Sequence, residues 1–346
     1  MTARRIITYS IFCLITTSNQ PLAAQVFDMT LTTELQTDFQ GGYNWVNLFR
    51  TDFQWAIARQ IHLNAGTIST VKTLEKRLAN DLQTFSNIEE ENIPLAIAVL
   101  GLDWQVGNST LFMGIRNLNE DYFTSACTSL FTNSSCGIFP TLSANYPIAN
   151  YPVASVGIDY KLLLENWLFE TSLYNGTGYR DFTGKENVFR FCPKTDGILS
   201  VTSINYRKYG NEYYLGIALH YGLPVGHEMG TENKETEKKE QNTIVWGYAE
   251  QRLTHNLHLL AQYSINPTER TGCRRYAGIG LIISAGKTRI GLFADHACFK
   301  DNQEWAGELT CKIPCLRNGY LQPTLHMIHN NHERKAIGLL RLGYTL

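Results

Sequence analysis

The sequence is poor in charge and has no long apolar run. Asp, Glu, Lys and Arg make up 18% of the 346 residues, whereas roughly 25% is usual for soluble domains. After residue 24 there is no run approaching the roughly 20 apolar residues that a transmembrane helix needs. The formal net charge is −1, so the excess of positive charge that attracts nucleic acid is missing. These absences argue against a helical membrane protein and against a nucleic-acid partner.

The first 24 residues have the three parts of a secretory signal peptide. Arg4 and Arg5 supply a basic start, residues 6–16 are apolar, and residues 22–24 are suited to cleavage. We therefore expect a cleaved signal peptide at residues 1–24. Because no linker or internal repeat interrupts the remainder, residues 25–346 are interpreted as one exported domain.

Most of the remaining chain alternates between apolar and polar residues, which is the pattern of strands with two different faces. Aromatic residues are plentiful, at 12%, and this suits a membrane barrel that hides its apolar surface in alternate positions. We predict an all-β fold, a transmembrane antiparallel β-barrel of about 16 strands. A secreted soluble β-protein has a similar composition and stays open at this point. The expected strands are 27–39, 45–58, 61–72, 94–107, 109–119, 154–163, 167–178, 197–210, 211–222, 241–254, 257–267, 273–284, 287–299, 303–314, 319–330 and 335–346.

The alternation also predicts which face of each strand meets lipid. In residues 213–221 and 156–162, every second side chain is apolar and the others are small or polar. A charged side chain facing the middle of a bilayer would cost roughly 2–4 kcal/mol. This register therefore places Asp159, Lys161 and Arg341 in the lumen.

Short and long connections alternate along the chain. The segments 209–211 and 285–287 suit tight hairpins, whereas residues 73–93 and 224–240 form long connections. This asymmetry is typical of barrels with short periplasmic turns and long outer loops. The connection at 73–93 is expected to hold a short helix over Leu74, Leu78 and Leu82.

The stretch from Tyr122 to Pro152 matches neither a strand nor a disordered tail. It is rich in Ser, Thr, Asn, Pro and aromatic residues and has almost no charge. In an oxidising compartment, Cys127 and Cys136 are expected to form a disulfide that stiffens this loop. The other cysteines have no assigned partner, and no second ligand pair lies near the C-x3-C spacing of the last two. We therefore expect no metal and no cofactor.

Three stretches carry a family resemblance when they are taken in order between alternating strands. They are DLQTFSNIEEENIPLAIAVLGLDW at residues 81–104, TSLFTNSSCGIFPTLSANYPIANYPVASVGIDYKL at residues 128–162, and GELTCKIPCLRNGYLQPTLHMIHN at residues 307–330. Together they resemble the carbohydrate-selective porins of the OprB type. The resemblance implies a sixteen-stranded outer-membrane channel that admits sugars into the periplasm, with the loop around residues 122–152 folded inward as a constriction.

A sugar path needs aromatic faces for stacking and fixed hydrogen-bonding groups. It also needs weak, repeated sites, because tight binding would block exit. About two thirds of the aromatic residues in the loop are expected to be packing residues instead. The candidate substrate-path residues are Tyr122, Phe123, Phe131, Asn133, Phe139, Tyr146 and Tyr151.

Charged residues with lumen parity complete the predicted path. Arginine suits bidentate contacts with hydroxyls or carboxylates, although opposed charges across a wet barrel can simply pair with one another. The candidate lumen charges are Arg50, Arg59, Asp103, Arg116, Asp159, Glu170, Arg207, Arg252, Arg289, Glu308 and Arg341.

The predicted function is therefore a porin, not an enzyme, that passes small carbohydrates passively across a Gram-negative outer membrane. Outer-membrane lipid is the second expected partner, and the barrel is either a homotrimer or a monomer. Two alternatives remain. An outer-membrane barrel enzyme of the lipase or protease type would need a nucleophile and a histidine at the rim, and no Gly-x-Ser-x-Gly motif is present. A secreted disulfide-bonded β-protein that binds a ligand would have no pore.

Overall fold

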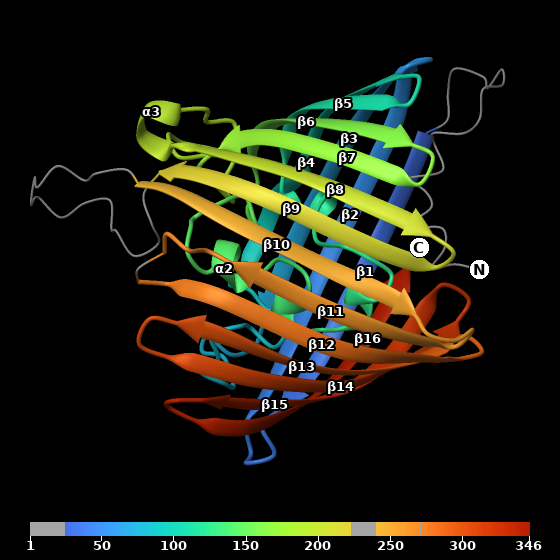
Figure 1. The fold of residues 1–346 in the computed structure, drawn as a ribbon, viewed down its shortest axis with the longest axis vertical. Helices are drawn as coiled ribbons and strands as arrows, with labels where there is room; N and C mark the ends of the chain where they lie inside the picture. The colour runs from blue at the N-terminus through green and yellow to red at the C-terminus, as the bar shows by residue number, and fades with distance from the viewer. Residues whose placement is uncertain (1–24, 223–239, 270) are drawn as a thin grey trace, which may run out of the picture.

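In the computed structural model, which describes residues 25–222, 240–269 and 271–346, sixteen antiparallel strands close into one barrel (Figure 1). Each strand pairs with its neighbours in sequence, and β1 pairs with β16 to complete the ring. The predicted fold class and strands are confirmed, whereas the signal peptide expected at residues 1–24 lies outside the described residues. The strands are β1 (Gln25–Thr37), β2 (Tyr43–Ala58), β3 (Ile61–Lys72), β4 (Ile93–Val106), β5 (Ser109–Arg116), β6 (Ser155–Leu164), β7 (Trp167–Asn175), β8 (Ile198–Lys208), β9 (Asn211–Gly222), β10 (Glu240–Arg252), β11 (Leu257–Ile265), β12 (Cys273–Ala285), β13 (Thr288–Phe299), β14 (Gln303–Leu316), β15 (Gly319–Asn330) and β16 (Arg334–Thr345).

The two faces of the wall follow the alternation of the sequence. Leu215, Ile279 and Leu292 point outward and are between 56% and 58% exposed. Their inward-facing strand neighbours are buried, and the same face carries the buried Asp159 and Arg341. An apolar outer surface of this extent is unfavourable in water and suits the hydrocarbon of a bilayer.

The seam between the first and last strands contains a buried ion pair. Glu34 on β1 lies directly opposite Arg341 on β16, and Arg341 Nε donates to Glu34 Oε1 at 2.6 Å. The other carboxylate oxygen of Glu34 accepts hydrogen bonds from Gln36 and Ser86. Because both charged groups have several partners, the cost of burying them is offset.

All the connections at one end of the barrel are short turns, and the long loops lie at the other end (Figure 1). The β8–β9 turn consists of Tyr209 and Gly210, with φ angles of 54° and 81°, which is the left-handed geometry that a tight hairpin requires. With an even number of antiparallel strands, β1 begins and β16 ends at the short-turn end. None of the helices in the described residues is long and apolar enough to cross a membrane.

The short helix predicted over Leu74, Leu78 and Leu82 is wrong, because residues 73–92 contain only turns and bends. Several backbone N–H groups of this loop donate to partners outside it. Leu82 N and Gln83 N donate to Glu304 on β14 at 2.8 and 3.1 Å. These contacts replace the i→i−4 bonds of a helix while leaving the backbone groups paired.

Candidate functional site

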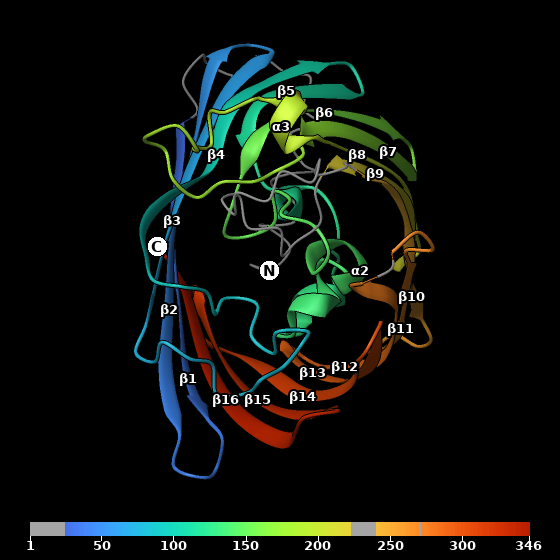
Figure 2. The ribbon, with the colours of Figure 1, turned by 90° about the vertical axis from the view of Figure 1, so that its left-hand side faces the viewer.

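The connection between β5 and β6, residues 117–154, runs inside the barrel, and we call it the inner loop. Viewed along the barrel, it lies within the ring of strands, with its helix α2 beside β10–β12 (Figure 2). The inward-folded loop that the family resemblance implied is therefore present. Its short helices are η1 (Leu118–Glu120), η2 (Thr128–Leu130), η3 (Ser134–Cys136) and α2 (Pro140–Ser143).

Aromatic rings pack the inner loop onto the wall. Phe123 contacts Trp246 on β10, and Phe131 contacts Phe293 on β13, each with ring centroids 5.0 Å apart. Burying a ring of this size contributes about 1.5–3 kcal/mol, and paired rings add about 0.5–1.5 kcal/mol. The loop is therefore held against one side of the barrel by apolar contacts.

The sequence-based assignment of sugar contacts needs correction at this point. Five of the rings that were expected to line the path are at most 2% exposed: Tyr122, Phe123, Phe131, Phe139 and Tyr146. Asn133 is also buried, and its Nδ2 donates to Asp295 on β13 at 3.0 Å. Burial this complete leaves these rings no face on which a sugar could stack. Within the predicted set, only Tyr151 is half-buried.

Carboxylates on the wall hold the backbone of the inner loop. Glu308 on β14 accepts from Thr132 N at 2.8 Å and from Asn133 N at 3.0 Å. Glu250 on β10 accepts from Cys127 N at 2.8 Å. These bonds satisfy N–H groups that would otherwise be buried without a partner. The loop is thus fixed by polar anchors as well as by aromatic packing.

The disulfide predicted between Cys127 and Cys136 is not formed, and both thiols are free and buried. The two residues are fixed to different strands, because Cys127 N bonds to Glu250 on β10 and Cys136 O accepts from Gln262 on β11 at 3.1 Å. Burial raises the pKa of both thiols above the ordinary value, which disfavours the reactive thiolate. The other free cysteines are Cys192, Cys273, Cys298, Cys311 and Cys315.

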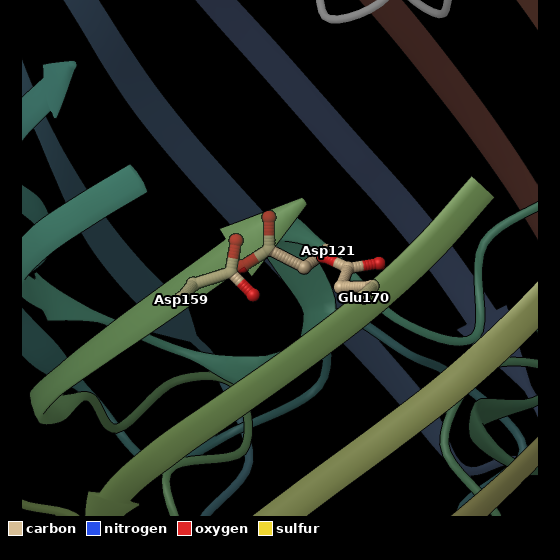
Figure 3. A group of neighbouring side chains, drawn as sticks. All are labelled: Asp121, Asp159 and Glu170. Atoms are coloured by element: carbon tan, nitrogen blue, oxygen red, sulfur yellow. The ribbon is translucent and has the colours of Figure 1, made fainter. Parts of the chain in front are cut away.

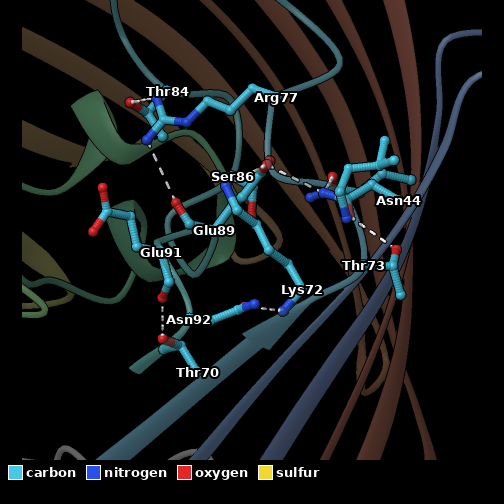
Figure 4. A network of polar contacts seen from close by, with 12 residues as sticks. Asn44, Thr70, Lys72, Thr73, Arg77, Thr84, Ser86, Glu89, Glu91 and Asn92 are labelled. Atoms are coloured by element: carbon cyan, nitrogen blue, oxygen red, sulfur yellow. Dashed lines mark hydrogen bonds and ion pairs between the residues drawn. The ribbon is translucent and has the colours of Figure 1, made fainter. Parts of the chain in front are cut away.

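A second connection, residues 73–92, also contributes to the interior, and we call it the second inner loop. Asn87 N donates to Thr132 O at 2.7 Å, and Ser134 N donates to Thr84 O at 3.0 Å. Polar contacts also order this loop internally, and Arg77 Nη1 donates to Thr84 Oγ1 at 2.8 Å (Figure 4). The two inner loops are therefore joined to each other as well as to the wall.

A cavity of about 570 Å³ lies between the two inner loops. Arg50 on β2, Glu90 and Glu120 supply its charges, and Tyr151 supplies its accessible aromatic ring. Uncharged polar residues make up much of the remaining lining: Gln83, Thr84, Asn87, Asn117, Asn119, Thr124, Ser129, Ser134, Ser135, Ser143 and Asn150. Such a lining offers many hydrogen-bond donors and acceptors and little net charge.

A second cavity, of about 490 Å³, is lined by charged residues, which include Lys72, Arg77, Glu91 and Arg180. Glu90 lines both cavities, so the two meet at this carboxylate. Burial raises the pKa of Glu90 to about 7. The junction therefore holds a group that changes charge near neutral pH.

Arg50 connects the wall to the inner loop across one side of the first cavity. Its guanidinium bonds both carboxylate oxygens of Asp52 at 2.7 Å, and both oxygens of Glu120 on η1 at 2.8 and 3.0 Å. Two bidentate pairs fix the planar group in one orientation. Glu120 is therefore held at the edge of the cavity by a wall residue.

Three carboxylates point toward one another (Figure 3): Asp121 directly after η1, Asp159 on β6 and Glu170 on β7. One oxygen from each lies within 4.8 Å of the others. Lys161 Nζ lies 3.1 Å from Glu170, and Arg116 Nη2 lies 2.7 Å from Asp121. Because these two cations supply the compensating positive charge, we interpret the group as an ion-pair network that joins the inner loop to β5–β7.

Two of the predicted lumen charges lie elsewhere. Arg59 is exposed in the two-residue turn between β2 and β3, because β2 ends at Ala58. Arg252 is exposed at the end of β10, where its Nε donates to Thr254 O at 3.2 Å. The remaining charges lie on the inner face: Arg50, Asp103, Arg116, Asp159, Glu170, Arg207, Arg289, Glu308 and Arg341.

Sequence reasoning placed no path residue in the second inner loop, yet Leu82, Gln83, Thr84, Asn87 and Glu90 of that loop line the first cavity. Residues 81–87 share the low charge and polar composition of the inner loop, and this likeness was a usable signal. The hydrogen bonds between the two loops carry no sequence signal, because they join backbone groups. Glu90 and Asn87 could therefore be found only from the folded chain.

No family model and no curated protein matches this sequence. Solved outer-membrane structures match it over nearly its whole length. OprB of Pseudomonas putida, in a low-pH structure, is similar with a TM-score of 0.57 and 10% identity, covering 93% of this chain and 92% of that one. OmpT, an outer membrane protein of Vibrio cholerae in a trimer form, is similar with a TM-score of 0.61 and 10% identity, covering 94% of this chain and 100% of that one. A mutant of the Rh. blastica porin is similar with a TM-score of 0.59 and 6% identity, covering 93% of this chain and 100% of that one.

At these identities the likeness concerns the fold. The chain has the closed sixteen-stranded barrel of the porins, with a loop folded into the lumen. The resemblance to carbohydrate-selective porins that the sequence suggested is thus matched at the level of architecture.

Proposed function

We propose that this protein is an outer-membrane channel, not an enzyme, that passes small neutral carbohydrates passively into the periplasm. The observation that carries the proposal is the polar, largely uncharged cavity of about 570 Å³ between two loops inside a closed barrel. The apolar outer surface supports insertion in a bilayer, with the long loops outward and the short turns in the periplasm. Export would proceed through the signal peptide at residues 1–24.

The lining suits sugars better than ions. A sugar presents many hydroxyl groups and an apolar ring face, and the cavity offers amide and hydroxyl side chains together with Tyr151. Arg50 is ion-paired with both Glu120 and Asp52. The charges on this side of the cavity are therefore engaged with one another and leave no unpaired cation or anion, among the described residues there, to attract a charged solute. Contacts of this kind are weak and numerous, which allows a solute to leave as readily as it enters.

A hydrolytic function is not supported by the buried Thr132, His326 and Glu308. Thr132 Oγ1 lies 2.8 Å from His326 Nε2 and 3.1 Å from Glu308 Oε1, which resembles part of a catalytic arrangement. All three residues are at most 1% exposed. Because a nucleophile must reach its substrate, we assign these contacts to anchoring of the inner loop.

Conductance in planar bilayers tests this proposal. We expect stable single-channel conductance that falls on addition of oligosaccharide and is unaffected by neutral amino acids. Replacing Tyr151 by Ala should weaken the sugar block severalfold, because it removes the accessible ring face, and a stacking contact on one aromatic ring contributes on the order of 0.5–1.5 kcal/mol. The matched control is Tyr263→Ala, which removes an outward-facing ring that is 50% exposed. Absence of conductance, or equal block in the Tyr151 and Tyr263 variants, would contradict the proposal.

A further inference from the structure

Formal charge on the outward face of the described strands is rare and unevenly placed. It occurs at Lys208, Arg275 and Arg334, with Arg274 in a bulge beside Arg275. Lys208 adjoins the short β8–β9 turn, whereas Arg275 and Arg334 lie at the long-loop ends of β12 and β16. Both arginines are exposed, and neither forms an ion pair with a described residue. Glu333, which directly precedes Arg334, accepts a hydrogen bond from Asn80 N at 2.6 Å and is not paired with Arg334. This edge of the outer surface thus carries two arginines without an ion-pair partner among the described residues.

Two histidines and a tryptophan fill the space between these arginines. The strand register places His296 opposite Trp305, Trp305 opposite His329, and His329 opposite Arg334, across β13–β16. Directly opposed residues lie roughly 4.5–5.5 Å apart, so the four form a continuous row. Arg275 on β12 lies next to this row, because it is opposite Cys298, the outward-facing residue two positions after His296 on β13. We call these four residues and Arg275 the outer row.

Each member of the outer row has a distinct chemical capacity. The His296 ring stacks on Trp305 with centroids 4.1 Å apart, and its Nε2 bonds to Gln303 Oε1 at 3.2 Å. This stacking positions an indole ring that is 54% exposed. His329, Arg275 and Arg334 are exposed and present N–H donors. An anion of tetrahedral geometry with a long apolar tail would match donors beside an exposed aromatic surface.

We propose that the outer row binds the phosphate-bearing headgroup of a lipid in the leaflet on the long-loop side. Arginine recognises phosphate by charge-assisted, bidentate hydrogen bonds, and tryptophan favours the level of the headgroups. Clusters of basic residues at a membrane surface select anionic lipids. Asp301, in the β13–β14 turn, is an exposed acid near the row, and the exposed Lys300 beside it offsets its charge. The inference rests on the proposed membrane setting and does not require that the barrel conducts.

Native mass spectrometry of the detergent-purified protein tests this site. The probes are lipid A with two phosphates, phosphatidylcholine, and inorganic phosphate alone. The variant Arg275→Gln/Arg334→Gln removes both arginines of the row. The control Lys287→Gln/Arg317→Gln removes the same charge from exposed turns at the opposite end of the barrel. We expect lipid A to bind the wild type and the control equally, and the row variant at least about tenfold more weakly, since each lost bond is charge-assisted.

Equal loss in both double variants, no loss in either, or no preference for lipid A over phosphatidylcholine would overturn the proposal. Competition by inorganic phosphate at the concentration of the lipid would overturn the assignment to a lipid. Heat-modifiable gel migration establishes that each variant is folded. Single-channel conductance of the same samples reports on the channel separately, because the outer row is remote from the lumen. A non-conducting protein that still binds lipid A through the row would contradict the proposed channel and leave this site intact.

Discussion

Glu90 stands where the two interior cavities meet, and its surroundings determine how it titrates. Loss of hydration raises its pKa to about 7, while Lys72 and Arg77 act in the opposite direction. The stabilising contribution of such a group is complete below about pH 4.5, the unfolded value, and is lost as pH rises through about 7. At the same time, the carboxylate gains a negative charge where the two cavities meet.

We therefore predict that cation selectivity rises between pH 6 and pH 8. Deprotonated Glu90 attracts K⁺ and repels Cl⁻ at the junction, so the reversal potential in a KCl gradient should shift toward that of K⁺. In Glu90→Gln this shift should be largely lost. The control, Glu75→Gln, removes an exposed acid from the lining of the second cavity and should retain the pH dependence. A shift of the same size in Glu90→Gln would show that another group titrates.

At the scale of the element, the inner loop is held by packing and wall carboxylates in place of a covalent cross-link. Phe131 is 1% exposed against Phe293, and Glu308 accepts from the next two backbone N–H groups. The nearest thiols, Cys127 and Cys136, are both free. Rigidity of the loop should therefore depend on its aromatic anchors and not on the redox state.

Phe131→Ala should loosen the inner loop, because truncating a buried phenylalanine typically costs about 3–5 kcal/mol. We expect larger single-channel fluctuations and weaker block by oligosaccharide, measured in planar bilayers. Addition of a reducing agent to the wild type should change neither property. A response to the reductant as large as that of the variant would mean that a disulfide, and not packing, holds the loop.

At the scale of the whole molecule, closure of the ring depends on the β1–β16 seam. Arg341 there bonds Glu34 and also donates from Nη2 to Asn87 Oδ1 at 2.6 Å. One arginine thus links the first strand, the last strand and the second inner loop. Every other strand pair consists of two strands that are consecutive in the sequence. Only this seam pairs strands from the two ends of the described chain.

Arg341→Ala should destabilise the folded barrel by about 3–5 kcal/mol, because it leaves the Glu34 carboxylate buried without its charged partner. The measurement is the temperature at which heat-modifiable gel migration is lost. The double variant Glu34→Gln/Arg341→Met removes both charges and should melt closer to the wild type. If the single variant melts no lower than the double variant, the ion pair has no stabilising role at the seam.

The fold was largely predictable because each strand obeys a local rule. Leu215 and Ile217 face outward while Tyr214 and Ala218 are buried, and this alternation is visible without any long-range contact. The candidate site was less predictable. Phe131 and Tyr146 are as aromatic in the sequence as Tyr151, yet only contact with β9 and β13 shows that they are packing residues.

The sequence by itself determined the strand order, the two faces of the wall and the existence of a long uncharged loop, because periodicity and turn composition act over a few residues. Only the tertiary structure decided which loop residues meet the lumen. It brought residues 73–92 against the inner loop, kept Cys127 and Cys136 apart, and placed Glu90 between two cavities. These outcomes depend on contacts between segments distant in sequence, and no local pattern encodes such contacts.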